Sequence, residues 1–86
     1  AELMREIGCQ FDKALAIGFR AVKMEVLFYD LVSDAELVKL IHEGRHMLGE
    51  GITMALDFGY RWKNWHDALW VLQRIADCNI YFAEAT

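Results

Sequence analysis

Apolar residues recur at helical spacing along the first third of the chain. From Ile7 to Leu31 they fall three, four or seven positions apart, and a second apolar set runs beside them. Such spacing is typical of an amphipathic helix with a wide buried face. The pattern therefore predicts one long helix over residues 2–31.

A second helix is predicted from a start signal. Ser33 and Glu36 match the capping box S-x-x-E, in which each side chain bonds the other residue's amide. The short turn over residues 31–33 makes the second helix an antiparallel neighbour of the first. Its apolar positions keep their period through Gly44 and Gly51, which favours a helix over residues 34–58 with both glycines on the inner face.

A third helix is predicted over residues 65–84. Asn64 is a suitable N-cap, and Asp67 lies three residues on in the first turn. Asn79 falls on the inner face of this helix, as a buried polar candidate. The absence of proline also favours helices over a turn-rich β fold. The fold class expected is all-α: one domain, residues 1–86, forming an antiparallel three-helix bundle with a long first helix.

The composition suggests a partner. Hydrophobic residues make up 56% of only 86 residues, against a usual ~45–50%. A chain this short has little interior in which to bury them. We therefore expect a homodimer or another protein partner, with Trp70 and Tyr81 on the outer side of the third helix as interface candidates.

The net charge, the apolar runs and the cysteines narrow the possible functions and the expected location of the protein. The net charge of −4 disfavours nucleic-acid binding, which needs a basic surface. No apolar run is long enough for a membrane span, and no signal segment is recognisable, so a soluble cytoplasmic protein is expected. Cys9 and Cys78 form no CxxC motif and are expected to be reduced thiols in the core.

The stretch His42-Glu43-Gly44-Arg45-His46 matches H-E-x-x-H, the pattern that sets two zinc-binding imidazoles one helical turn apart. Helical projection places both histidines on the polar face, where Glu43, His46, Glu50 and Asp57 form an acidic strip. Zinc or magnesium is a conceivable cofactor here, although none is expected. The candidate metal residues are His42, Glu43, His46 and Glu50, and the competing interpretation is a solvated helix face.

An aromatic and basic segment follows the second helix. Its side chains could stack on a ligand, contact a partner protein or simply pack within a loop. The candidate contact residues are Tyr60, Arg61, Trp62, Lys63, Trp65 and His66.

Residues 67–77 resemble the third-helix segment of the all-α nucleotide pyrophosphohydrolases. That resemblance implies a helical dimer that uses Mg²⁺ held by paired acidic motifs, although Asn64 stands where one motif has a glutamate. We expect a non-enzymatic, homodimeric interaction or regulatory module. The alternatives are a metal-dependent hydrolase that uses the HEGRH stretch and a protein like these pyrophosphohydrolases.

Overall fold

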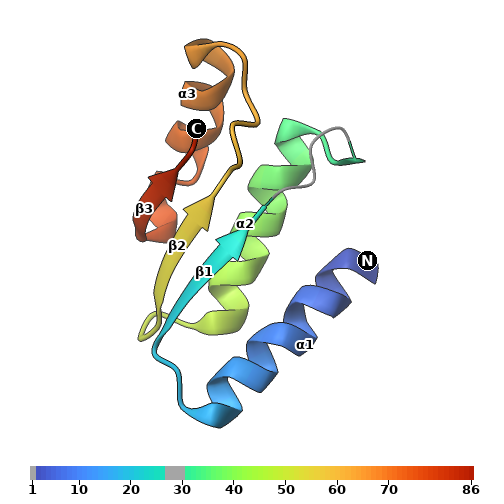
Figure 1. Ribbon diagram of the computed structural model, residues 1–86, viewed down its shortest axis with the longest axis vertical. Helices are drawn as coiled ribbons and strands as arrows, with labels where there is room; N and C mark the ends of the chain where they lie inside the picture. The colour runs from blue at the N-terminus through green and yellow to red at the C-terminus, as the bar shows by residue number, and fades with distance from the viewer. Residues whose placement is uncertain (1, 27–30) are drawn as a thin grey trace.

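A computed structural model, which describes residues 2–26 and 31–86, shows alternating helices and strands (Figure 1). The elements in order are α1 (Glu2–Ile17), β1 (Ala21–Glu25), α2 (Asp34–Leu48), β2 (Thr53–Asp57), α3 (Trp65–Arg74), the 3₁₀ turn η2 (Ala76–Cys78) and β3 (Ile80–Glu84). The strands form one parallel sheet in the order β1-β2-β3. The predicted all-α three-helix bundle is therefore wrong, and the chain has an α/β fold.

The first predicted helix ends early because Gly18 stops it. Gly18 has φ 104°, a left-handed conformation that glycine adopts at low cost. Its amide bonds the Leu15 carbonyl at 3.0 Å, and the Phe19 amide bonds the Ala14 carbonyl at 3.2 Å. These two bonds form a Schellman end. The chain then enters β1, and residues 27–30 of the expected helix lie outside the described part.

The start of α2 is confirmed, but its length is not. Ser33 accepts a bond from the Glu36 amide, and the Glu36 side chain accepts one from the Ser33 amide. The helix ends at Leu48, and Gly49 follows with φ 80°. Gly44 is buried as predicted, whereas Gly51 is an exposed turn residue with open space around it.

The third helix is likewise capped as predicted and shorter than predicted. The Asn64 side chain accepts a bond from the Asp67 amide at 3.0 Å. The helix ends at Arg74, and Asn79 takes a left-handed conformation with φ 54° between η2 and β3. Asn79 is exposed, so its predicted place on a buried face is wrong.

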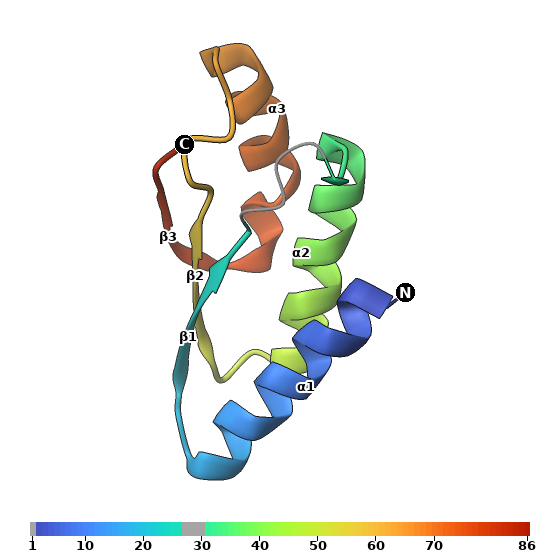
Figure 2. The ribbon, with the colours of Figure 1, turned by 45° about the vertical axis from the view of Figure 1, so that its right-hand side comes forward.

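All three helices lie on one side of the sheet (Figure 2). Parallel strands need such crossover connections, because a tight hairpin cannot join them. The core fills the space between the two layers, and its fully buried members include Leu37, Ile41, Met54, Leu56, Phe58 and Val71. On β1, Lys23 and Glu25 alternate with buried Met24 and so project to the opposite, uncovered face.

The two cysteines were predicted to be reduced thiols in the core. Cys9 and Cys78 are both free thiols, as expected, but only Cys78 is buried and Cys9 is exposed. Among the described helices, none combines the length and the apolar character that crossing a bilayer requires.

Candidate functional site

Each strand of the sheet ends in a carboxylate. Glu25, Asp57 and Glu84 are the last residues of β1, β2 and β3. The register pairs Glu25 with Asp57 and Asp57 with Glu84. Neighbouring strands lie ~4.8 Å apart, so the three residues form one row across the carboxyl edge of the sheet. We call this the carboxylate row.

A lysine from the first strand reaches the far end of this row. Lys23 Nζ lies 3.2 Å from Glu84 Oε1, and the two side chains are 43% and 49% exposed. The hydrogen bond to Glu84 and the negative charge of that carboxylate raise the pKa of Lys23 above its ordinary value. Lys23 is therefore a protonated ammonium group at neutral pH.

The central carboxylate is oriented by its own loop. Asp57 Oδ1 accepts a hydrogen bond from the Gly59 amide at 2.9 Å, a local turn that aspartate favours. Gly59 can serve this turn because it takes a left-handed φ of 59°. Asp57 is half-buried. Its carboxylate thus has one oxygen tied to the backbone.

Backbone hydrogen bonds extend the sheet past the row. The Val26 amide donates to the Asp57 carbonyl at 2.9 Å, and the Phe58 amide donates to the Glu84 carbonyl at 2.9 Å. These bonds hold the backbone just past Glu25 and Asp57 and at the Glu84 carbonyl. Carboxylate oxygens are the ligands that a hard divalent cation prefers, although among the described residues these three do not form a group whose ligand atoms gather at one point. The row offers neither nitrogen nor sulfur.

The metal candidates of the HEGRH stretch do not gather at one point. His46 and Glu50 are exposed, and Glu43 is half-buried. Among the described residues, His42 belongs to one group of potential metal ligands, and the other members are Asp77 and Cys78. Glu43, His46 and Glu50 are not part of that group. Arg45, inside the motif, is buried against the turn that follows the helix. These positions give no support to a zinc hydrolase built on this stretch.

The aromatic and basic segment is partly used for packing. Arg61 Nε and Trp62 Nε1 both donate to Asp34 Oδ1 at 3.0 Å, and this anchors the segment to the start of α2. Trp62 also packs against Phe58, with ring centroids 4.7 Å apart.

Other members of the segment are more open. The Trp65 and His66 rings stack at 3.7 Å between centroids on the exposed start of α3. Tyr60 is 82% exposed, and Lys63 is also exposed. Contact of these residues with a ligand or a partner stays a prediction.

The two proposed interface residues are also on the surface. Trp70 and Tyr81 are 38% and 75% exposed. The Arg74 guanidinium lies 3.9 Å from the centre of the Trp70 ring and covers one side of it. A protein partner at Trp70 and Tyr81 stays a prediction.

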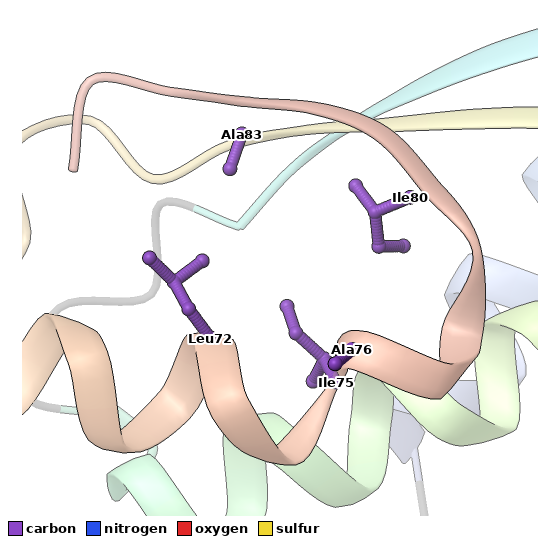
Figure 3. A pocket seen from close by; sticks show the side chains of 5 residues that line it. All are labelled: Leu72, Ile75, Ala76, Ile80 and Ala83. Carbon is purple, nitrogen blue, oxygen red and sulfur yellow. The ribbon is translucent and has the colours of Figure 1, made fainter.

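An apolar hollow of about 200 Å³ lies between α3 and β3. Figure 3 shows side chains from α3 and the η2 turn that follows it facing side chains of β3, and the lining consists of Leu72, Ile75, Ala76, Ile80 and Ala83. No charged or hydrogen-bonding side chain lines this hollow, so it offers no group for acid–base or metal chemistry.

Lys23, Glu25 and Glu84 were not among the residues predicted from the sequence. Asp57 was predicted to lie in an acidic strip on the second helix, whereas it lies at the end of β2. A signal for them exists. Three short, mainly apolar runs, over residues 21–24, 52–56 and 80–83, are each followed by an acidic residue, and a capped helix separates one run from the next. Repetition of strand, helix and strand predicts parallel strands whose carboxyl ends meet.

No protein-family model and no curated protein matches the chain. Several solved structures have similar folds. A protein assigned as a racemase is 34% identical, with a TM-score of 0.88 over 96% of this chain and 22% of its own. A racemase from Streptomyces coelicolor A3(2) with bound magnesium is 26% identical, with a TM-score of 0.82 over 95% of this chain and 23% of its own.

The third structure, assigned as a mandelate racemase from Bordetella bronchiseptica RB50 and complexed with 2-oxoglutarate/phosphate, is 18% identical. Its TM-score is 0.78 over 95% of this chain and 21% of its own, and this likeness concerns the fold alone. The chain thus spans between a fifth and a quarter of the length of the racemases it matches.

These similarities overturn the functional prediction from sequence. The neighbours are enzymes with an α/β fold, so the expected non-enzymatic helical module is wrong. The alternatives, a HEGRH hydrolase and a helical nucleotide pyrophosphohydrolase, lack support for the same reason. Magnesium, which was conceivable from the sequence, is present in one of these relatives.

Proposed function

We propose that this chain supplies part of the active site of a magnesium-dependent racemase whose substrate is a carboxylic acid with a hydrogen on its α-carbon. The observation that carries the proposal is the alignment of Asp57 with Glu84, together with the bond from Lys23 to Glu84. The racemases with 34% and 26% identity, one of them with bound magnesium, add support.

Asp57 and Glu84 are the residues assigned to the metal. They come from adjacent strands at the same edge, and the Gly59 amide orients Asp57. Their oxygen atoms match the ligands that magnesium prefers. When bound, magnesium supplies positive charge that stabilises the enolate formed by loss of an α-proton.

Lys23 and Glu25 are assigned to the substrate. They lie two positions apart on one strand, so both project from the uncovered face of the sheet. The Lys23 ammonium, which is bonded to Glu84 in the absence of metal, exchanges that partner for the substrate carboxylate when Glu84 takes the metal. Glu25 accepts the α-proton, and the electrons of the broken C–H bond pass into the enolate. Water delivers a proton to the opposite face of the α-carbon, which gives the other enantiomer, and Glu25 releases the proton it accepted to solvent.

Magnesium binding tests the metal assignment without knowledge of the substrate. In calorimetric titrations of the intact protein, Asp57→Asn and Glu84→Gln should each weaken magnesium binding at least tenfold. Asp12→Asn, at an exposed site on α1, and Glu43→Gln, in the HEGRH stretch, are matched controls and should bind magnesium as the parent does. A loss of magnesium affinity in Glu43→Gln as large as that in Asp57→Asn and Glu84→Gln would contradict the assignment.

Proton exchange tests the chemistry. Single enantiomers of 2-hydroxy and 2-amino acids are incubated with the intact protein in D₂O, and α-deuterium is followed by NMR. We expect exchange with at least one acid, dependent on magnesium and abolished by a chelator. A protein that binds magnesium at Asp57 and Glu84 yet exchanges none of these acids would retain the metal assignment and lose the racemase one.

A further inference from the structure

A second cluster of potential ligands lies in the helical layer, on the covered side of the sheet. His42, in the middle of α2, faces Cys78, the last residue of η2. The His42 Nδ1 atom is 3.3 Å from Cys78 Sγ. Asp77 stands beside them, with Oδ1 3.8 Å from His42 Nε2. One potential ligand atom from each of the three residues lies within 4.8 Å of the others.

The hydrogen bond on the far side of the imidazole determines its tautomer. His42 Nε2 lies 2.8 Å from the Arg74 carbonyl oxygen. A carbonyl oxygen can only accept, so Nε2 carries the hydrogen and Nδ1 presents a lone pair towards Cys78 Sγ. Without a metal, the Cys78 thiol is the donor to that lone pair. Burial, followed by the negative charge of Asp77, raises the pKa of Cys78 and keeps this thiol neutral.

The same arrangement is the one that zinc-binding histidines adopt. Such a histidine usually donates its second ring N–H to a carbonyl or carboxylate, which fixes the ring for the metal. Zinc takes Nδ1 and a thiolate at roughly 2.0 and 2.3 Å, which places nitrogen and sulfur about 3.5 Å apart in a tetrahedral site. The observed separation of 3.3 Å is close to that spacing.

The backbone around Cys78 is held in place by a buried arginine. Arg45 Nε donates to the Cys78 carbonyl at 2.7 Å, and Arg45 Nη2 donates to the Asn79 carbonyl at 3.1 Å. Arg45 belongs to the same helix as His42 and follows it by three residues. The positions of Cys78 and His42 are therefore fixed relative to each other before any ion arrives.

Solvent can reach the cluster from one side. The His42 and Asp77 side chains are 41% and 81% exposed, while Cys78 closes the inner side. The exposed Asp77 carboxylate lies on the Nε2 side of the ring, so it would have to rotate to reach an ion that binds between His42 Nδ1 and Cys78. Water would complete the coordination.

We propose that His42, Cys78 and Asp77 form a site for zinc or a similar transition-metal ion. Imidazole and thiolate are ligands that zinc prefers and magnesium does not. Binding releases the thiol proton to solvent, so that sulfur coordinates as thiolate. The site lies across the sheet from the carboxylate row and depends on none of its residues.

Cobalt(II) is a suitable probe, because a cobalt–thiolate bond gives a near-ultraviolet charge-transfer band that carboxylates cannot produce. Titration of the intact protein with cobalt should give this band at one equivalent, and zinc should displace it. Cys78→Ser should abolish the band, whereas Cys9→Ser, at the exposed second cysteine, should leave it unchanged. A band that survives in Cys78→Ser, or no band in the parent protein, would overturn the proposal.

The histidine and aspartate need separate variants. His42→Ala should weaken cobalt binding at least tenfold. Loss of a residue that only supports a metal ligand can already weaken binding that much, and His42 is itself a ligand. His46→Ala, four residues on and exposed, should leave it unchanged. Asp77→Asn changes an exposed side chain, so it keeps the fold and should also weaken binding. Equal affinities in His42→Ala and His46→Ala would reject the site. The band should also persist in Asp57→Asn, so this variant distinguishes failure of the magnesium site from failure of the zinc site.

Discussion

Lys23 and Glu84 lie 61 positions apart in the sequence, yet their Nζ and Oε1 atoms are 3.2 Å apart. The strand order is β1-β2-β3, so this ion pair joins the two outer strands and passes over the middle one. The residue of β2 that lies opposite Lys23 is Ala55, which is only 5% exposed. A small side chain at that position leaves room for the lysine to cross.

A larger residue at position 55 should separate the pair. In Ala55→Leu we expect the pKa of Lys23 to fall towards its ordinary value of 10.5, because the hydrogen bond and charge of Glu84 are the largest causes of its rise. A group with a raised folded-state pKa stabilises the fold below its unfolded pKa, and this contribution is lost as pH rises through the folded-state value. NMR titration of the lysine side chain measures the change. Ala16→Leu, at an exposed site of α1, is the control. An unchanged Lys23 pKa in Ala55→Leu would refute the conclusion that the lysine side chain passes over position 55.

Arg45 should be the most costly polar residue to replace. It is 7% exposed and donates to four carbonyl oxygens, those of Cys78, Gly49, Ile52 and Asn79. Arg45→Met leaves these acceptors without their donor, at about 1 kcal/mol or more each. We expect a loss of roughly 3 kcal/mol or more in the free energy of unfolding, measured in urea. Arg45→Lys keeps the charge but not the planar fork, so it should recover only part of the loss. Full stability in Arg45→Met would show that water replaces the arginine.

The sequence was sufficient for features formed by residues close together in the chain. Ser33 with Glu36 and Asn64 with Asp67 are each three positions apart, and both caps are present where they were predicted. Helix starts are readable in this way because each cap bonds an amide of its own first turn.

The strands could not be found by the same reasoning. β1 and β2 are five residues long, and each follows a helix closely enough for its apolar positions to fit an extended helical period. What separates the two interpretations is the pairing of strands, such as Val22 with Met54, which is remote in the sequence. The carboxylate row was invisible for the same reason. Its members become neighbours only through that register.

Two glycines should respond to alanine with opposite sign. At Gly44, an added Cβ would meet Met54 Cε and Phe11 Cε2 at 3.5 Å, ordinary contact distances, so the better helix propensity of alanine decides. We expect Gly44→Ala to stabilise by about 0.5–1 kcal/mol. At Gly18 nothing lies within 4 Å, but φ is 104°, and alanine there is strained by its backbone alone. Gly18→Ala should destabilise by about 1 kcal/mol. Thermal unfolding compares the two, and a shift of the same sign in both variants would contradict this account.

The capping box should give α2 a pH-dependent contribution to stability. The hydrogen bond from the Ser33 side chain, then that from its amide, lower the pKa of Glu36 below its ordinary 4.5. A lowered folded-state pKa means that this contribution is present above the unfolded pKa and is lost as pH falls through the folded one. Ser33→Ala should cost about 1 kcal/mol at neutral pH, and it should flatten the decline of stability in acid. Urea unfolding across the acidic range tests both. A decline as steep as that of the parent would mean that other carboxylates cause it.

Glu25 separates proton transfer from metal binding within the carboxylate row. It pairs with Asp57 in the register, but it lies on β1, and β2 separates that strand from the strand of Glu84. If it accepts the α-proton, Glu25→Gln should lower the exchange rate in D₂O by a factor of about 100 or more. Asp57 and Glu84 remain in place, so magnesium affinity should stay close to that of the parent. Glu25→Asp, which keeps the carboxylate but withdraws it by one methylene, should recover part of the exchange. Exchange that is unaffected in Glu25→Gln would give the proton-accepting role to another group, and a loss of magnesium binding as large as that in Asp57→Asn would make Glu25 a metal ligand.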